Sequence, residues 1–217
     1  MQSRHFLIGG VMLGALLACS PARSQDETFT ELKSGKKFPA KITFSHEGRE
    51  ITLIPTGALQ VRKEAKKSAD AAAGETALYT LAHYMEEAKP EGLQSLYDMI
   101  LEKPVAKQMI LDFDREATAD HLKRVYARFF AKALTPEQHQ QMKGAIDEFI
   151  ATLNADIMPK QQIVFRWLPD NSLVIVLPNA PEKVLGASPL ASWLWKAWFS
   201  EASPIDRSSL VEKLTAK

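Results

Sequence analysis

The sequence predicts an α+β protein with a mostly antiparallel sheet. Segments with the two-residue alternation of β-strands are grouped, at 42–63 and again at 163–177, and do not alternate one by one with helices. Apolar residues at helical spacing lie between and after these groups. Several strands are apolar on both faces. The face that the helices leave uncovered must therefore meet another layer, a partner or a ligand cleft.

The first group of strands begins with a hairpin. Residues 39–54 hold two alternating runs around the turn His46–Arg49. Pro55–Gly57 is expected to break the returning strand, which resumes over 58–63. The run Ala77–Met85 is largely apolar on both faces and predicts a long central strand.

The second group of strands and the helices complete the domain. Lys107–Phe113 predicts a strand, and Ile163–Leu177 predicts a hairpin around the turn Pro169–Ser172. The Ala- and Lys-rich connector 66–74 favours neither a helix nor a strand. Apolar stripes and cap residues predict helices over 91–101, 118–133, 136–150 and 188–199, and a short one capped by Asp206.

The N-terminus has the pattern of an export signal. Arg4 and His5 precede an apolar run, Phe6–Ala18, that is too short to span a bilayer comfortably. We therefore predict a signal peptide over residues 1–24, a flexible lead-in over 25–38 and one domain over 39–217. The predicted location is the periplasm.

Two processing sites fit this leader. The small residues of Ala22–Ser24 allow cleavage before Gln25, which would release a soluble protein. Alternatively, Leu16–Ala18 followed by Cys19 resembles a lipobox, in which Cys19 would carry a lipid anchor to the membrane. The sequence leaves both alternatives open, and it does not indicate an oligomeric state.

Composition excludes several functional classes. The net charge is +1 over 217 residues, and the two signs are interspersed, so the sequence shows no basic patch of the kind that binds nucleic acid. The single Cys rules out a zinc-type cysteine cluster, and the five His have no HxxxH or HExxH spacing. No carboxylate pair, nucleophile triad or phosphate loop is recognisable. We therefore expect no metal site and no cofactor.

Five short sequences carry a resemblance to a known family. They are FPAKITFSHEGREITLIPTGALQVRK, ALYTLAHYME, KQMILDFDREATADHLKRVYARFF, VFRWLPDNSLVIVLP and LASWLWKAWFSEASPID. In their order, the chain over roughly residues 35–214 resembles the chalcone isomerase-like proteins, and within them the exported bacterial group. The resemblance implies an open-faced β-sandwich, with a large antiparallel sheet, helices layered on one side, and a ligand cleft between sheet and helices.

The resemblance also implies ligand-binding residues. Gly57–Arg62 resembles the family's glycine-then-Val-Arg strand, so Arg62 would hold an anionic oxygen of the ligand. Tyr79 takes the place of the plant enzymes' catalytic threonine, His121 that of a tyrosine, and Arg128 that of an asparagine. Because the residues that orient a chalcone are mostly replaced, we expect no chalcone isomerisation. The structural alternatives are a solvent-facing Arg62, a core Tyr79 and an exposed first-turn His121.

Three functions remain open. The first is a non-catalytic envelope protein that binds a small amphipathic anion, such as a fatty acid, in the cleft above Arg62. The second is an intramolecular lyase like the plant relatives, and the third is a structural or interaction module of the envelope. A sheet that is apolar on both faces, with one candidate cation, favours the first.

Overall fold

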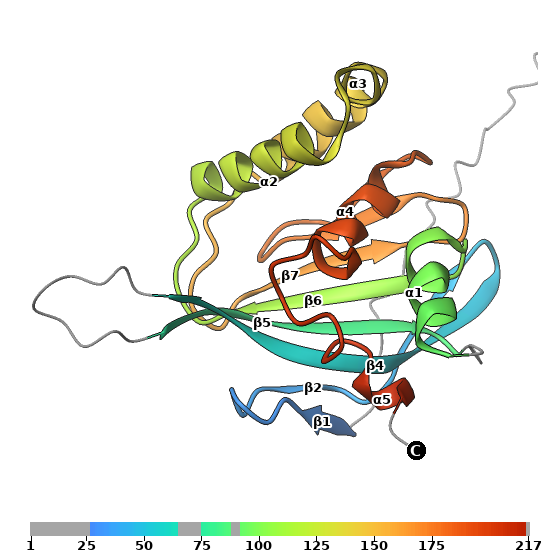
Figure 1. Cartoon of the computed structure of the whole chain (residues 1–217), viewed down its shortest axis with the longest axis vertical. Helices are drawn as coiled ribbons and strands as arrows, with labels where there is room; N and C mark the ends of the chain where they lie inside the picture. Colours follow the sequence, from blue (N-terminus) through green and yellow to red (C-terminus); the bar gives the residue numbers. More distant parts are fainter. Residues whose placement is uncertain (1–26, 65–74, 88–91, 216–217) are drawn as a thin grey trace, which may run out of the picture.

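The computed structural model describes residues 27–64, 75–87 and 92–215. The predicted signal peptide, with Cys19, and the connector 66–74 lie outside these residues. The described chain forms a seven-stranded antiparallel sheet that carries helices on one face (Figure 1). The predicted α+β class is therefore confirmed.

The strands of the sheet lie side by side in the order of the chain. They are β3 (Ile42–His46), β4 (Arg49–Glu64), β5 (Glu75–Glu86), β6 (Lys107–Phe113), β7 (Gln162–Trp167), β8 (Leu173–Val176) and β9 (Lys183–Leu185). Each is antiparallel to its neighbours. All the predicted strands are present, and β9 is an edge strand that the sequence pattern did not reveal.

The helices of the described chain are α1 (Leu93–Glu102), α2 (Ala119–Ala133), α3 (Pro136–Thr152), α4 (Leu190–Phe199) and the short α5 (Glu212–Thr215). Two of the predicted caps form. Thr118 accepts a hydrogen bond from the backbone of His121, and Thr135 forms a capping box with Gln138. The last helix begins later than predicted, because Asp206 accepts hydrogen bonds from Ser208 and Ser209 in a preceding turn. No helix in the described ranges is long and apolar enough to cross a bilayer.

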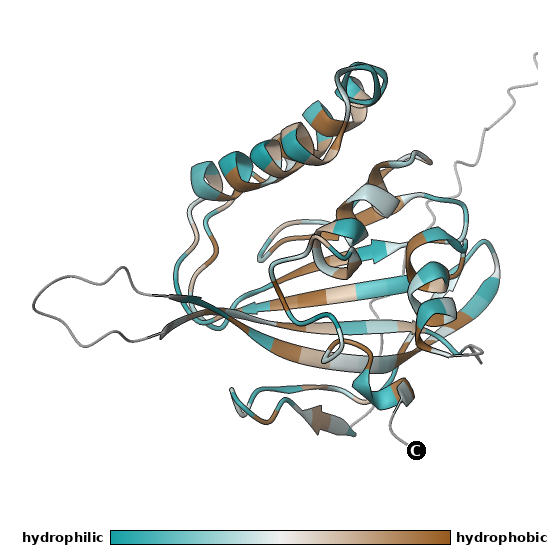
Figure 2. Cartoon of the chain, in the orientation of Figure 1, coloured by the Kyte–Doolittle hydropathy of each residue, from teal (hydrophilic) through white to brown (hydrophobic). Residues whose placement is uncertain are grey.

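Both faces of the sheet are buried, by different layers. On the helix side, Leu81 and Phe165 belong to a core that also contains Phe130 of α2. On the other side, Tyr84 and Ile110 belong to a second core. Figure 2 shows hydrophobic residues concentrated along the middle strands and interspersed with hydrophilic ones along α2. The sheet has a core on each side because its strands are apolar on both faces.

The second core is closed by curling of the sheet and by the N-terminal hairpin. Arg166 of β7 lies 4.2 Å from the ring centroid of Phe44 of β3, although β4, β5 and β6 separate these strands in the sheet. β1 (Thr28–Thr30) pairs with β2 (Lys37–Pro39) as a separate two-stranded sheet on this side (Figure 1).

The N-terminal hairpin corrects the prediction of a flexible lead-in over residues 25–38. From Thr28 onward this segment contains regular structure. Phe38 is fully buried in the second core, and the Tyr84 hydroxyl donates a hydrogen bond to the carbonyl of Pro39 at 2.9 Å. The hairpin is ordered by the apolar sheet face that it covers and not by a local signal of its own.

A chain of buried polar groups ties the C-terminal segment to β4 and β5. Trp195 Nε1 donates to His83 Nε2 at 3.1 Å, and Thr56 Oγ1 lies 2.7 Å from His83 Nδ1 and 2.6 Å from the carbonyl oxygen of Leu210. Because a carbonyl only accepts, Thr56 donates to Leu210 and accepts from His83 Nδ1–H. His83 is therefore neutral. Burial lowers its pKa well below the usual value, and the charge of Lys107 acts in the same direction.

Gly57 lies where the C-terminal segment approaches β4. A Cβ atom at this position would lie 2.2 Å from the carbonyl oxygen of Ser209 and 2.6 Å from the carbonyl carbon of Leu210. The β4–β5 register shifts between Pro55 and Gly57. The predicted strand break is thus an irregularity within one continuous strand, and glycine is required there by contact.

Replacement of Gly57 tests this contact. We expect Gly57→Ala to lower the free energy of unfolding by about 1–3 kcal/mol, because the methyl group overlaps backbone atoms. Gly144→Ala is the matched control, since Gly144 lies on α3 and its Cβ would meet open space. It should raise the free energy by roughly 0.5–1 kcal/mol through helix propensity. Urea unfolding measures both changes, and a neutral Gly57→Ala would show that the C-terminal segment does not pack here.

Lys107 of β6 is a fully buried lysine. Its Nζ donates to the carbonyl of Lys103 at 2.6 Å and lies 3.7 Å from the centroid of a Trp167 ring. Burial lowers the pKa of Lys107 to about 7, and the opposing effect of Glu86 is smaller. The folded protein therefore loses this proton well before the unfolded chain does.

This difference predicts a pH dependence of stability. Between pH 7 and 9 the unfolded chain keeps the proton of Lys107 while the folded protein has released it. The free energy of unfolding should therefore rise, by about 1 kcal/mol per pH unit. Lys107→Met should remove this rise and be at least as stable as the parent at pH 7, because the cost of burying the charge is gone. Urea unfolding across this pH range is the measurement. Lys103→Met, at an exposed position, should retain the rise.

Candidate ligand-binding site

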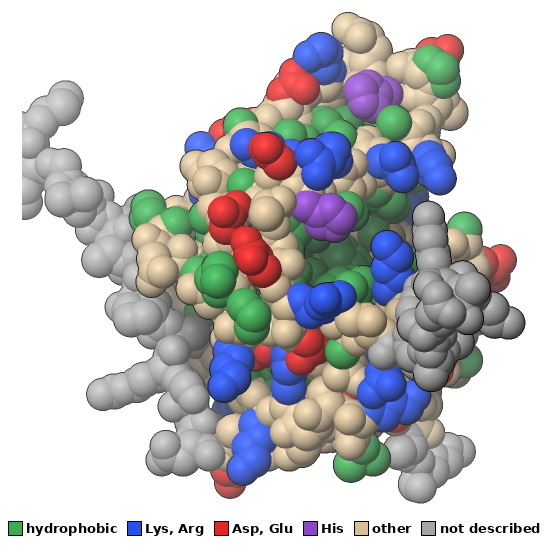
Figure 3. All heavy atoms as spheres, turned by 90° about the vertical axis from the view of Figure 1, so that its left-hand side faces the viewer, with side chains coloured by type: hydrophobic (Ala, Val, Ile, Leu, Met, Phe, Trp, Pro, Cys, Tyr) green, Lys and Arg blue, Asp and Glu red, His purple; other side chains and the backbone are tan. Residues whose placement is uncertain are grey.

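A cavity of about 560 Å³ lies between the helix-side face of the sheet and helices α2 and α4. Its lining is mostly apolar and aromatic, and includes Val61, Leu111 and Phe113 from the strands and Val125, Phe129 and Trp198 from the helices. Figure 3 shows a hollow of hydrophobic side chains on this side of the molecule, with a histidine and several basic side chains around it. The cavity is therefore open to solvent at one end.

The cavity exists because the helix layer covers this part of the sheet incompletely. α2 buries Leu122, Tyr126 and Phe130, but Val125 and Phe129 on its next stripe are only partly covered. Ala117 and Ala197 also line the space, and a methyl group fills little of it.

The polar groups inside the cavity are neutral. Trp198 Nε1 donates a hydrogen bond to the Tyr79 hydroxyl at 3.4 Å. Burial raises the pKa of Tyr79 and raises that of Tyr126 well above the usual value, and the neighbouring Tyr79 adds to the shift of Tyr126. Both tyrosines stay protonated at neutral pH. Their hydroxyls can therefore donate hydrogen bonds to a ligand.

Charged groups lie at the rim. Arg115 and Glu116, in the segment between β6 and α2, line the cavity and are exposed, as is His121 in the first turn of α2. The site thus has a neutral interior and a polar entrance. This arrangement accommodates a molecule with an apolar part and one polar end.

The structure brings two of the three predicted ligand-binding residues to the cavity. Tyr79 and His121 both belong to its lining, and their contact with a ligand stays a prediction. Arg62 does not belong to the lining. Its Nε donates to Gln60 Oε1 at 2.8 Å, and the side chain is exposed.

The placement of Arg62 follows from the pleat of β4. Successive side chains of a strand point to opposite faces, and Val61 is the residue that lines the cavity. Gln60 and Arg62 share the other face. The expectation that Arg62 anchors a head group inside the cleft does not match this structure, and the solvent-facing alternative does.

Sequence reasoning missed Tyr126, Trp198 and Arg115 as site residues. Tyr126 and Trp198 belong to helical stripes that were interpreted as core. A stripe that faces a cavity has the same spacing as one that faces packed side chains. Arg115 follows a strand in a short connection, and no local pattern separates it from other surface arginines.

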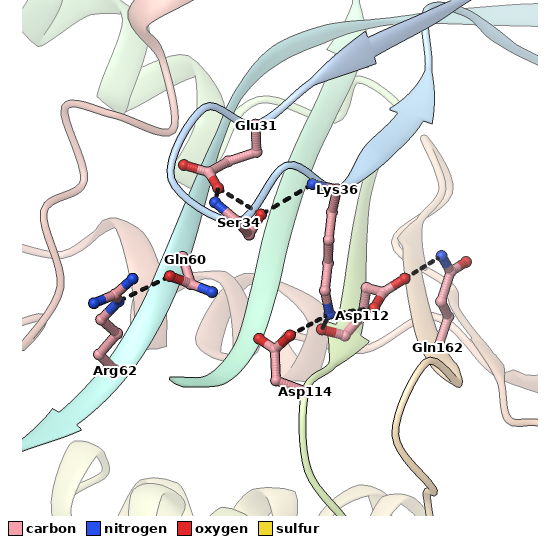
Figure 4. Close-up of polar contacts among 8 residues, drawn as sticks. All are labelled: Glu31, Ser34, Lys36, Gln60, Arg62, Asp112, Asp114 and Gln162. Carbon is pink, nitrogen blue, oxygen red and sulfur yellow. Dashed lines mark hydrogen bonds and ion pairs between the residues drawn. The ribbon is translucent and has the colours of Figure 1, made fainter. Parts of the chain in front are cut away.

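The opposite face of the sheet carries a polar cluster of its own (Figure 4). Lys36, from the turn between β1 and β2, forms ion pairs with Asp112 and Asp114. Gln162 donates to Asp112 at 2.9 Å. This cluster fastens the N-terminal hairpin to the end of β6, on the side away from the cavity.

One group of side chains among the described residues could hold a metal ion. His46, Glu47 and Asp170, in the β3–β4 and β7–β8 turns, offer ligand atoms within 4.8 Å of one another. His46 Nε2 and Asp170 Oδ2 are 3.8 Å apart, and Glu47 and Asp170 are exposed. None of the three lines the cavity.

These features define a class of protein: a curled antiparallel sheet with helices on one face and a ligand cavity between the two layers. Residues 75–214 match the model of the chalcone isomerase-like family. The chain belongs to that family, as the sequence predicted. Membership of the exported bacterial group stays a prediction.

A search of curated proteins found no match. Among solved structures, the chain is similar to the crystal structure of a fatty-acid binding protein from Arabidopsis thaliana. The TM-score is 0.67 and the sequence identity 13%, over 87% of this chain and 96% of that chain. The similarity confirms the predicted fold, an open-faced antiparallel sheet with helices on one side.

The state of the cavity tyrosines can be tested by alkaline titration. The chain has four Tyr, and burial raises the pKa of each. At pH 10 the folded protein should therefore show much less phenolate absorbance than the urea-unfolded protein, in which tyrosines are about half ionised. Stability should fall as the pH rises through 10, because only the unfolded chain gains by losing these protons. Equal phenolate signals in the two states would mean that the cavity tyrosines are hydrated.

Proposed function

We propose that this protein binds a fatty acid, or a similar small amphipathic anion, in the cavity between sheet and helices and catalyses no reaction on it. The observation that carries the proposal is a neutral, largely apolar cavity of about 560 Å³ with charge confined to its rim. Ligand pockets in proteins have volumes of roughly 300–1,000 Å³ and are mostly apolar with a few polar groups.

The interior suits an acyl chain. Each methylene that leaves water for an apolar surface contributes about 0.8 kcal/mol. Phe113 and Phe129 supply such a surface from opposite sides of the cavity, one from β6 and one from α2. Because the lining offers few hydrogen-bonding groups, a polar ligand of the same size would lose hydration without replacement.

The rim suits the anionic head group. An ionised carboxylate that is buried without a cation is costly, and the charged side chains of the lining lie at the entrance. Arg115 can grip a carboxylate bidentately, and the His121 ring can donate a further hydrogen bond. Glu116 lies beside Arg115 and would repel a second negative charge on the ligand. The proposed orientation is therefore head group at the rim and chain inside, with the Tyr79 hydroxyl available for a polar substituent.

The comparison supports the ligand class. A protein of the same fold, from Arabidopsis thaliana, is described as a fatty-acid binding protein. The leader pattern over residues 1–24 supports a place of action in the periplasm. There the chain would begin at Gln25, or at a lipidated Cys19 that anchors it to the membrane.

An intramolecular lyase is less well supported. General acid–base catalysis favours a group whose pKa lies near the working pH. The interior titratable groups are tyrosines whose pKa values burial raises, and His121 lies at the rim. Neither arrangement favours proton transfer inside the cavity.

Filling the cavity tests the proposal. Ala197→Phe places a ring in the lining, so the affinity for a fluorescent fatty acid should fall at least about tenfold through loss of space. Ala131→Phe, at an exposed position of α2, adds the same group and should leave the affinity unchanged. Both proteins are first checked for an unchanged unfolding transition. Native mass spectrometry of the purified parent shows whether a lipid copurifies.

The same titration locates the head group. Arg115→Gln should weaken binding by up to about 1 kcal/mol, the range for an ion pair at an exposed position. Arg62→Gln removes the same charge outside the cavity and should have no effect. If Ala197→Phe binds as tightly as the parent, the cavity is not the binding site. If Arg62→Gln and not Arg115→Gln weakens binding, the proposed orientation is wrong.

A further inference from the structure

We infer that the side of α2 beside the cavity opening docks onto an anionic lipid bilayer, so that the ligand passes directly between the membrane and the cavity. This inference rests on the proposed function. It adds a partner, a membrane surface, and assigns it to particular residues of one helix.

The docking surface is one stripe of α2. His121, Val125, Arg128 and Lys132 follow one another at spacings of four, three and four residues, which places them on one side of the helix. All four are exposed. The first two line the cavity, so the stripe begins at the opening and continues along the helix from it.

The stripe combines positive charge with one apolar side chain. Val125 is 47% exposed, which makes it one of the large hydrophobic residues that the described surface leaves open to water. Arg128 and Lys132 supply two positive charges, and Arg115 adds another at the rim. Figure 3 shows basic side chains around the hollow.

Acidic residues near the stripe are few. Asp120 precedes His121 by one residue, and a step of about 100° turns it away from the stripe. Glu116 lies at the rim beside Arg115, and Asp156 accepts a hydrogen bond from the backbone of Ala119 at the start of α2. The stripe itself therefore carries only basic and apolar residues, in a chain whose net charge is +1.

A bilayer is the occupant that this chemistry fits. Anionic head groups attract Lys and Arg side chains without any fixed geometry, and a short apolar side chain can enter the head-group layer between them. The deeper apolar face of α2 is not available, because Leu122, Tyr126 and Phe130 are buried against the rest of the protein. The contact is therefore shallow and mainly electrostatic. Its position at the opening lets an acyl chain move from lipid to cavity without crossing water.

Vesicle binding tests the inference. The protein starting at Gln25 is used, so that the apolar run of the leader cannot contribute. We expect it to cosediment with vesicles that contain phosphatidylcholine and phosphatidylglycerol, but not with vesicles that contain only phosphatidylcholine. It should dissociate from the anionic vesicles as the salt concentration is raised. The paired change Arg128→Glu with Lys132→Glu should weaken binding by roughly thirtyfold or more, since each basic residue near an anionic surface contributes about a factor of five.

The matched control changes the same charge elsewhere. Lys123 lies on the other side of α2 and Lys143 on α3. Lys123→Glu with Lys143→Glu should reduce vesicle binding far less than the first pair. If both pairs of substitutions weakened vesicle binding to a similar extent, the effect would come from net charge alone, and the proposed docking surface would be wrong. Absence of binding to anionic vesicles would overturn it as well.

A titration of fluorescent fatty acid in vesicle-free solution separates this inference from the proposed function. The Arg128→Glu, Lys132→Glu protein should bind the fatty acid as the parent does, because neither residue lines the cavity. Binding in solution without vesicle docking leaves the proposed function in place and rejects the membrane surface. Failure of the parent to bind any fatty acid in solution rejects the proposed function itself.

Discussion

The apolar character of both faces of the sheet is the constraint on which this structure depends. Along β5, Leu81 belongs to the helix-side core, whereas Ala82 and Tyr84 belong to the core on the other side. Such a strand cannot leave either face in water. Helices cover one face, and the N-terminal hairpin and the curl of the sheet cover the other. The cavity is the place where the helix layer, between α2 and α4, does not fill its side completely.

The parts of the fold that sequence alone revealed are those with local signals. Alternation located β4, a long apolar run located β5, and a capping box located the start of α3 at Pro136. The β1–β2 hairpin and β9 have three-residue strands, whose pairing depends on distant partners. No local pattern around Phe38 predicts its burial, because the sheet face that buries it is formed by residues that come later in the chain. Long-range burial is invisible to a periodicity argument.

The site was predictable to a smaller extent, because the face of a residue changes with every step along a strand. The family resemblance reached the correct segment of β4, but Val61 lines the cavity and its neighbour Arg62 does not. A shift of one residue exchanges the two faces of a strand. Residue type and approximate position therefore do not determine which side chain meets the ligand, whereas Tyr79 and His121 reach the cavity as implied.

Where the charges lie bears on how a ligand would be exchanged. The buried ionisable groups His83 and Lys107 have depressed pKa values, which keep His83 neutral at pH 7 and weaken the hold of Lys107 on its proton, and neither lines the cavity. The interior of the cavity therefore offers no fixed charge for an anion to pair with. In the proposed orientation, a head group held at the rim by Arg115 would remain partly hydrated, and such exposed ion pairs are weak compared with buried ones. Affinity would then come chiefly from burial of the acyl chain. An affinity set mainly by chain length would discriminate among ligands by the size of the apolar part that the cavity can hold, and much less by the head group.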